Sequence, residues 1–182
     1  ELWKSDGTAS GTVMVKDINS GSGGGSVGYL TAVGNTLYFR ANEGTNGVEL
    51  WKSDGTESGT MMVKNIRSSG SGSSYPIYLT AVGNTLYFGA NDGTNGYELW
   101  KSDGTASGTV MVKDFKPNGN GDPSYLTAVG NTLYFQANDG TNGVELWKSD
   151  GTASGTVMVN DISSGSSSSN PYFLTAVGNT LY

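Results

Sequence analysis

The sequence predicts an all-β protein assembled from four near-identical units of about 48 residues each. The tetrapeptide Glu-Leu-Trp-Lys recurs at Glu1, Glu49, Glu98 and Glu145, at start-to-start distances of 48, 49 and 47 residues. Short runs rich in Val, Thr, Leu, Tyr and Phe alternate with turns of Gly, Asn, Asp and Ser, which is typical of short strands joined by tight turns. Apolar residues do not recur at the i, i+3, i+4, i+7 spacing of an amphipathic helix.

The unit from Tyr78 to Phe115 shows how each strand is predicted. Gly83-Asn84 suits a two-residue hairpin turn, because both residues tolerate positive φ. The next apolar run is continuous, which favours a strand buried on both faces. Asp103-Gly104 marks a later turn, where a short carboxylate can accept backbone N–H groups. The four strands are expected at Tyr78–Val82, Thr85–Phe88, Tyr97–Lys101 and Thr109–Lys113.

Four serially connected antiparallel strands in about 48 residues are the content of one propeller blade. The chain opens with third and fourth strands and closes with first and second strands, so its two ends could together complete one blade. We therefore predict a β-propeller of four four-stranded blades, within a single repeat domain spanning residues 1–182 of a longer protein. An open stack of sheets or a filament is the alternative, and two chains could also close a larger ring.

Composition excludes several classes of function. The net charge is −6, with 10 Lys and Arg against 16 Asp and Glu, and no basic stripe is present, so nucleic-acid binding is not expected. No apolar run approaches the roughly 20 residues of a membrane-spanning helix. The chain has no Cys and no His. It therefore lacks disulfides, thiolate metal ligands and the base of Ser-His-Asp or Cys-His catalysis.

The connections between units differ far more than the strands do. They cover residues 19–28, 67–77, 116–124 and 163–172 and are rich in Gly, Ser, Asn and Pro. In propeller topology they share a face with the loops that join second and third strands. That face is the predicted binding surface for a protein or glycan partner. Its candidate contacts are Tyr29, Tyr75, Tyr78, Tyr125, Tyr172, Asn42, Asn91 and Asn138.

Other recurrent residues are predicted to be structural. Lysines end the fourth, outer strand and would oppose pairing at the sheet edge, at Lys16, Lys64 and Lys113. One tryptophan per unit is expected between blades with its indole N–H bonded to backbone, at Trp3, Trp51, Trp100 and Trp147. One aspartate per unit is expected to stabilise a turn, at Asp6, Asp54, Asp103 and Asp150.

Paired carboxylates near the loops raise two chemical alternatives. The oxygen-rich loops suggest weak calcium binding at Asp92 and Glu98 and at Asp139 and Glu145, although a plain turn explains them better because the ligand ladder of an EF-hand is missing. The same pairs could act in glycoside hydrolysis. Every unit repeats them, however, and nothing in the sequence desolvates one carboxylate relative to the other. No catalytic residue and no cofactor are therefore predicted.

The octapeptide Glu-Leu-Trp-Lys-Ser-Asp-Gly-Thr resembles the ELWxxDGT repeat of large secreted or surface-exposed bacterial proteins. It occurs at Glu1–Thr8, Glu49–Thr56, Glu98–Thr105 and Glu145–Thr152. The resemblance implies a β-propeller fold and an extracellular or cell-surface location. Similarity to kelch units and to the Asp-box of sialidases is looser. A sialidase is excluded, because its arginine cluster cannot be built from Arg40 and Arg67 alone.

Uniform strands with differing connections favour a non-catalytic extracellular module for binding or adhesion, acting through several weak equivalent sites. A purely structural repeat that assembles into a multi-chain ring or filament is the alternative, with a possible homo-oligomer or longer array. A glycan-acting enzyme is a distant third, for want of catalytic residues.

Overall fold

The computed structural model of the chain describes residues 1–69 and 72–182, and the expected all-β class is confirmed. Part of the predicted 67–77 connection, at residues 70–71, lies outside the described residues. Three sheets have four antiparallel strands each, and two have only two. The first two-stranded sheet pairs β1 (Leu2–Lys4) with β2 (Val13–Lys16). The last pairs β15 (Ala176–Val177) with β16 (Thr180–Leu181).

In each four-stranded sheet the strands follow one another in chain order. The first sheet holds β3 (Gly28–Val33), β4 (Thr36–Asn42), β5 (Val48–Ser53) and β6 (Met61–Lys64). The second holds β7 (Ile77–Val82), β8 (Thr85–Asn91), β9 (Tyr97–Ser102) and β10 (Val110–Lys113). The third holds β11 (Ser124–Val129), β12 (Thr132–Asn138), β13 (Val144–Ser149) and β14 (Val157–Asn160).

Strand boundaries follow the sequence closely, with one clear difference. Val82 pairs with Thr85 across the Gly83-Asn84 turn, so the predicted two-residue hairpin is confirmed. The second strand continues past its predicted end at Phe88, because Gly89 pairs with Leu99 and Asn91 with Tyr97. Backbone pairing with β9 therefore extends β8 through residues whose side chains do not favour strand.

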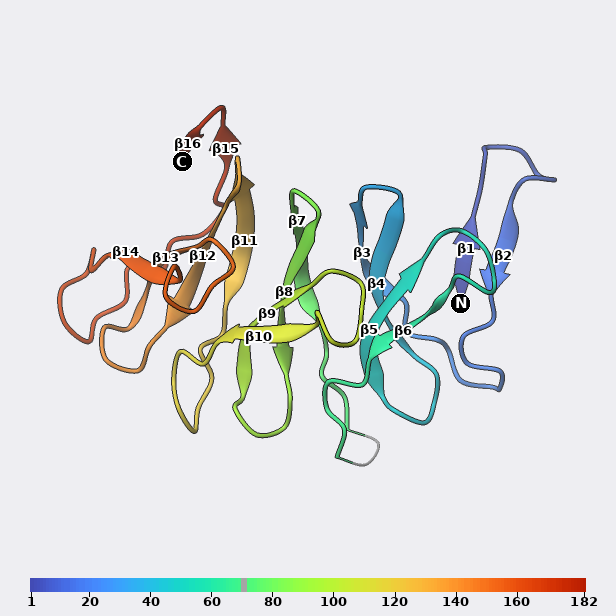
Figure 1. The fold of residues 1–182 in the computed structure, drawn as a ribbon, viewed down its shortest axis with the longest axis horizontal. Helices are drawn as coiled ribbons and strands as arrows, with labels where there is room; N and C mark the ends of the chain where they lie inside the picture. Colours follow the sequence, from blue (N-terminus) through green and yellow to red (C-terminus); the bar gives the residue numbers. More distant parts are fainter. Residues whose placement is uncertain (70–71) are drawn as a thin grey trace.

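The sheets stand side by side in chain order, and the hairpins β1–β2 and β15–β16 lie at opposite ends of the row (Figure 1). The expected completion of one blade by both ends is not seen among the described residues, because the two hairpins remain separate sheets. The first hairpin and the three four-stranded sheets pack against one another in chain order through buried apolar clusters.

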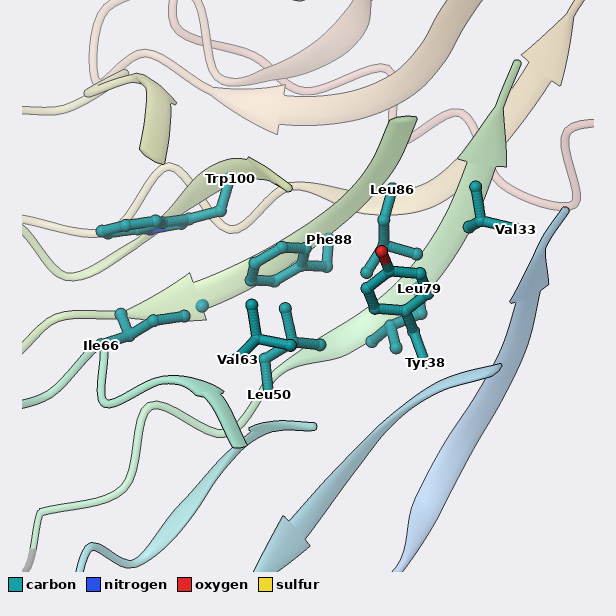
Figure 2. Close-up of a cluster of buried hydrophobic side chains, with 10 residues drawn as sticks. Val33, Tyr38, Leu50, Val63, Ile66, Leu79, Leu86, Phe88 and Trp100 are labelled. Atoms are coloured by element: carbon teal, nitrogen blue, oxygen red, sulfur yellow. The ribbon is translucent and has the colours of Figure 1, made fainter. Parts of the chain in front are cut away.

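Apolar side chains fill the spaces between the first hairpin and the three four-stranded sheets. Middle strands bury both faces: Leu86 and Phe88 of β8 point into one core and Tyr87 into the next. This confirms the interpretation of the continuous apolar runs. Figure 2 shows the core between the first and second four-stranded sheets. It contains Val33, Tyr38, Leu50, Val63, Ile66, Leu79, Leu86, Phe88, Ala90 and Trp100.

Three series of hydrogen bonds connect successive sheets at equivalent positions. In the first, Lys4, Lys52 and Lys101 donate from Nζ to the carbonyls of Gly55, Gly104 and Gly151 at 2.8, 2.9 and 2.8 Å. In the second, Lys16, Lys64 and Lys113 donate to the carbonyls of Thr60, Thr109 and Thr156 at 2.9, 2.8 and 2.9 Å. In the third, the hydroxyls of Thr31, Thr80 and Thr127 donate to the carbonyls of Leu79, Leu126 and Leu174 at 3.1, 3.2 and 3.2 Å. The lysines predicted to protect sheet edges thus also tie each sheet to the next.

The lysine contacts give a matched pair of variants. Lys52→Met keeps the aliphatic stem but removes the bond to Gly104, and we expect it to lower the free energy of unfolding by about 1 kcal/mol. Lys148 is the equivalent residue of the last four-stranded sheet, is exposed and makes no hydrogen bond among the described residues. Lys148→Met should change stability by less than about 0.5 kcal/mol. Urea unfolding measures both, and equal losses would contradict the connecting role.

Candidate functional site on the loop face

We define the loop face as the end of the sheets that carries loops 43–47, 92–96 and 139–143 with connections 17–27, 65–69, 72–76, 114–123 and 161–173. The two kinds of segment lie together (Figure 1). The backbone N–H groups of Asn42, Asn91 and Asn138 donate to the carbonyls of the connections at Gly25, Ser74 and Gly121, at 2.7, 3.0 and 2.8 Å. The side-chain Oδ1 atoms of the same asparagines accept from Gly44, Gly93 and Gly140, each at 2.7 Å. Each asparagine therefore fixes a loop against a connection.

Buried glutamates anchor the connections from below. Glu49, Glu98 and Glu145 are each 0% exposed. Glu98 accepts from the backbone of Phe115 at 2.9 Å and of Gly121 at 2.7 Å. Glu49 and Glu145 accept equivalent backbone bonds and also bond a serine hydroxyl, that of Ser74 or Ser169, each at 2.6 Å. These carboxylates hold the ends of each connection in place.

The three buried glutamates differ in pKa, which the sequence did not indicate. Burial raises the pKa of Glu98 to about 7; hydrogen bonds from Phe115 and Gly121 oppose it, and nearby Asp114 and Asp122 add to it. Burial also raises the pKa of Glu49 despite its hydrogen bonds. For Glu145, burial is outweighed by the bonds from Ser169 and Ile162, which leave its pKa below the ordinary value. Burial acts on both members of the Asp92 and Glu98 pair, but hydrogen bonds outweigh it only at Asp92, so the pKa of Glu98 is raised and that of Asp92 lowered; the expectation that neither carboxylate of the pair is desolvated relative to the other is wrong.

The four calcium candidates do not converge on one point. Asp92 accepts from the backbone of Thr94 and Asn95 at 2.8 Å each and from the Asn95 amide at 2.7 Å, within its own loop. Asp139 makes the equivalent bonds. Burial raises the pKa of each aspartate, and these donors outweigh it and leave the pKa lowered. Glu98 and Glu145 bind the connections instead. Residues 1–69 and 72–182 contain no group of three or more His, Cys, Asp or Glu side chains placed to hold a metal ion.

The Asp-Gly turns lie between third and fourth strands. Asp103 accepts from the backbone N–H of Thr105 at 2.8 Å and from its hydroxyl at 2.7 Å, and the other three units repeat this pair of bonds. The hydroxyl, then the backbone N–H, lowers the pKa of each aspartate, so these carboxylates stay charged in their turns. The set comprises Asp6, Asp54, Asp103 and Asp150.

The tryptophans divide by position. Trp51, Trp100 and Trp147 are buried against the preceding sheet, whereas Trp3 is 58% exposed because no described sheet covers that face of β1. The Trp147 indole donates to the carbonyl of Ala137 at 3.1 Å, but those of Trp51 and Trp100 have no partner among the described residues. Lys64 and Lys113 of the preceding sheets place their Nζ atoms 6.0 and 5.4 Å from the ring centroids of Trp100 and Trp147. These indoles serve packing between sheets.

Four aromatic residues at equivalent positions form an exposed row at the loop-face ends of the first strands. This aromatic row consists of Tyr29, Tyr78, Tyr125 and Phe173. The ring centroids of Tyr78 and Tyr125 lie 6.1 Å apart, and those of Tyr125 and Phe173 lie 6.2 Å apart. Tyr29 holds the equivalent position in β3, which contacts β7, and so begins the row. Its members are between 36 and 77% exposed.

The backbone conformation sets the direction of these four side chains. All four residues have φ between 55 and 56°, a left-handed conformation that is rare for bulky side chains. In the three four-stranded sheets the strand register shifts at the same place, between Gly28 and Thr31 in the first of them. A bulge of this kind redirects a side chain and is frequent near functional sites. Strain repeated in every unit is the most distinctive feature of the loop face.

The remaining predicted tyrosines flank the row. Tyr75 also has positive φ, at 45°, and is 47% exposed. Tyr172 is 62% exposed and packs edge-on against Phe173 at 5.1 Å. Sequence reasoning missed Phe173 because it considered tyrosines alone, although aligning the units places Phe173 beneath Tyr125. It also missed Arg40, whose guanidinium carbon lies 4.5 Å from the Tyr29 ring centroid.

A polar pocket of about 360 Å³ opens elsewhere on the loop face. Two successive connections and the loop between β8 and β9 enclose it. Its lining consists of Arg67, Asn91, Gly93, Thr94, Gly96, Asn118, Gly119 and Asn120. Only Asn91 was a candidate from the sequence, because the other segments are distant in the chain.

Comparisons of the chain with protein-family models, with curated proteins and with solved structures give no match. Within the described part of the chain there is no helix that could cross a membrane.

Proposed function

We propose that the chain is a non-catalytic extracellular binding or adhesion module that contacts a protein or glycan partner through its loop face. The observation that carries this proposal is the aromatic row, in which four rings at equivalent positions are exposed on strained backbone. The extracellular location rests on the resemblance to the ELWxxDGT repeats.

Exposed aromatic rings are the side chains that contribute most to binding surfaces, since they offer large apolar area at little conformational cost. Here they recur at 6.1 and 6.2 Å. A ligand with repeating groups, such as a glycan chain, could contact several rings at once and gain by avidity. The carboxylates near the loops are committed to hydrogen bonds within the fold, which favours binding over catalysis.

The test removes two aromatic rings and leaves the backbone conformation in place. Tyr78→Asn and Tyr125→Asn remove two rings while asparagine still accepts positive φ. Retention is measured on cellulose, chitin and xylan and on plates coated with fibronectin or collagen. We expect the double variant to lose binding at least about tenfold. Trp3→Ser, which removes an exposed ring distant from the loop face, should leave binding unchanged. Absence of binding to every probe, or binding indifferent to the double variant, would contradict the proposal.

A second candidate function is a structural repeat that assembles into a closed propeller of several chains or into a filament. The observation that favours it is the threefold repetition of the lysine and threonine bonds between sheets. A further sheet from a second chain could pack on the row through the same kinds of hydrogen bond. Light scattering coupled to size-exclusion chromatography tests assembly, and a monomer of 18.9 kDa at all concentrations would argue against it.

A further inference from the structure

The polar pocket is lined by polar residues that play no part in the proposed function. It lies between two connections, and the aromatic row forms no part of its lining. Gly93 and Gly96 let the segments around the pocket approach closely, since a Cβ would lie 3.0 Å from Arg67 Nε at Gly93 and 1.9 Å from the Gly119 carbonyl oxygen at Gly96. A volume of about 360 Å³ lies at the small end of ligand pockets and suits one or two sugar rings.

Arg67 gives the pocket its charge. Its Nε atom is buried and finds no hydrogen-bond partner among the described residues. A buried donor left unpaired is costly, and more so when it carries charge. The guanidinium group matches the geometry of a carboxylate, with two parallel N–H donors. Because Nε is buried against Gly93, an incoming carboxylate would pair with the terminal nitrogens of the guanidinium group.

The amides around Arg67 present donors as well. The Oδ1 atom of Asn91 accepts from Gly93 at 2.7 Å, and the Oδ1 atom of Asn120 accepts from Tyr97 at 3.0 Å. With their oxygens occupied, both side chains have amide N–H groups left to donate to a ligand. Thr94 and Asn118 complete a lining suited to ligand hydroxyls. A pocket rich in donors selects a ligand rich in oxygen acceptors.

The negative charge of Asp92 opposes an anion in this pocket. Asp92 lies in the same loop, and its lowered pKa keeps it ionised at neutral pH, although burial acts against this. Its carboxylate is held by three donors from Thr94 and Asn95 and is not part of the lining. The affinity should accordingly be modest, in the millimolar range for a single sugar.

We propose that the polar pocket binds a hexuronate residue of an acidic polysaccharide, with its carboxylate on Arg67 and its hydroxyls on the surrounding asparagines. The units place Asn19, Arg67, Lys116 and Ser163 at the equivalent position, so the arginine is particular to this pocket. The inference adds a site to the loop face and does not depend on the aromatic row.

The test titrates the chain with D-glucuronate, D-glucose and acetate, followed by amide chemical shifts in two-dimensional NMR. We expect shifts at Gly93 and Gly96 with glucuronate, binding at least about tenfold weaker with acetate, and none with glucose. Equal binding of glucose would overturn the role of charge. Equal binding of acetate would overturn the sugar assignment.

Variants separate this site from the aromatic row. Arg67→Gln should weaken glucuronate binding at least about tenfold, and Arg67→Lys, which keeps the charge but not the fork, by less. Lys148→Gln removes the same charge outside the pocket and should have no effect. Tyr78→Asn should also leave glucuronate binding intact. A failure of the aromatic row to bind can therefore be distinguished from a failure of the Arg67 pocket. Glucuronate binding that survives Arg67→Gln in a folded chain overturns the inference. If the glutamine variant does not fold, Arg67→Lys takes its place, and unchanged glucuronate binding in that variant overturns the inference.

Discussion

Gly104→Ala is expected to lower the free energy of unfolding by about 2 kcal/mol more than Gly55→Ala. The two glycines occupy equivalent turns and have nearly the same φ, 89° and 88°. Alanine therefore suffers the same backbone strain at both. A Cβ at Gly104 would lie 2.4 Å from the hydroxyl of Tyr38 in the neighbouring sheet, whereas a Cβ at Gly55 would meet nothing within 4 Å. The difference between the variants isolates the contact between sheets.

Tyr38 cannot simply move aside. Its ring is 5% exposed and packed in the core between the two sheets. Its hydroxyl sits at the end of a rigid ring, so relief requires the sheets to separate slightly. Tyr38→Phe removes the clashing oxygen, and in the Gly104→Ala background it should restore part of the lost stability. Urea unfolding of the four chains completes the cycle. Equal losses at Gly55 and Gly104 would show that the sheets do not pack as described.

The repeat and its strands could be predicted because their signals are local. Gly83-Asn84 sets a hairpin turn, and the apolar run beginning at Leu86 indicates a strand buried on both faces. Both signals lie within a few residues of the structure they specify. These local signals would be the same in an open row of sheets and in a closed ring. What distinguishes the two is the angle between neighbouring sheets, which depends on how side chains interlock across each core. The sequence could therefore predict the sheet but not the arrangement of its copies.

The loop face was predictable only as a location. The positive φ of Tyr78 arises from a register shift with β8, and no turn residue marks it. The Arg67 pocket needs segments from two connections and a loop, which lie far apart in the chain. Glu98 resembled a metal ligand because it follows an oxygen-rich loop, yet the fold buries it completely. Each miss concerns a property that only packing between distant segments creates.

The stability of the chain should fall as the pH rises from 5 to 8, with Glu98 as a principal cause. Burial raises the pKa of Glu98 from 4.5 to about 7. The unfolded chain therefore releases this proton at lower pH than the folded chain does. The stabilisation is fully present below pH 4.5 and is lost as the pH rises through about 7. At 1.36 kcal/mol per pKa unit, the loss from this residue between pH 5 and pH 8 is about 2 kcal/mol.

Few other groups obscure this window. The chain contains no His, and the turn aspartates have lowered pKa values, so they titrate below it. Burial raises the pKa of Glu49 and of Asp122, and both act in the same direction as Glu98. Total stability therefore declines by more than the Glu98 share, and a variant is needed to isolate that share.

Glu98→Gln isolates the contribution of Glu98 to the decline in stability, because an uncharged amide resembles the protonated acid. The two carboxylate oxygens of Glu98 face different donors, the N–H groups of Phe115 and Gly121, and glutamine can satisfy only one. A fixed loss of about 1 kcal/mol is thus expected at every pH. The decline between pH 5 and 8 should shrink by about 2 kcal/mol relative to the unaltered chain.

Glu145→Gln is the matched control. Glu145 accepts the equivalent bonds from Ile162 and Ser169, but its pKa is lowered, since hydrogen bonds outweigh burial. Its replacement should shift stability by a similar constant amount and leave the decline between pH 5 and 8 unchanged. The contrast follows from the cover over each carboxylate: Phe115 beside Glu98 is 5% exposed, whereas Ile162 beside Glu145 is 55% exposed, so burial raises the pKa more at Glu98. A full decline in Glu98→Gln, or a reduced one in Glu145→Gln, would refute this assignment of the titrating group.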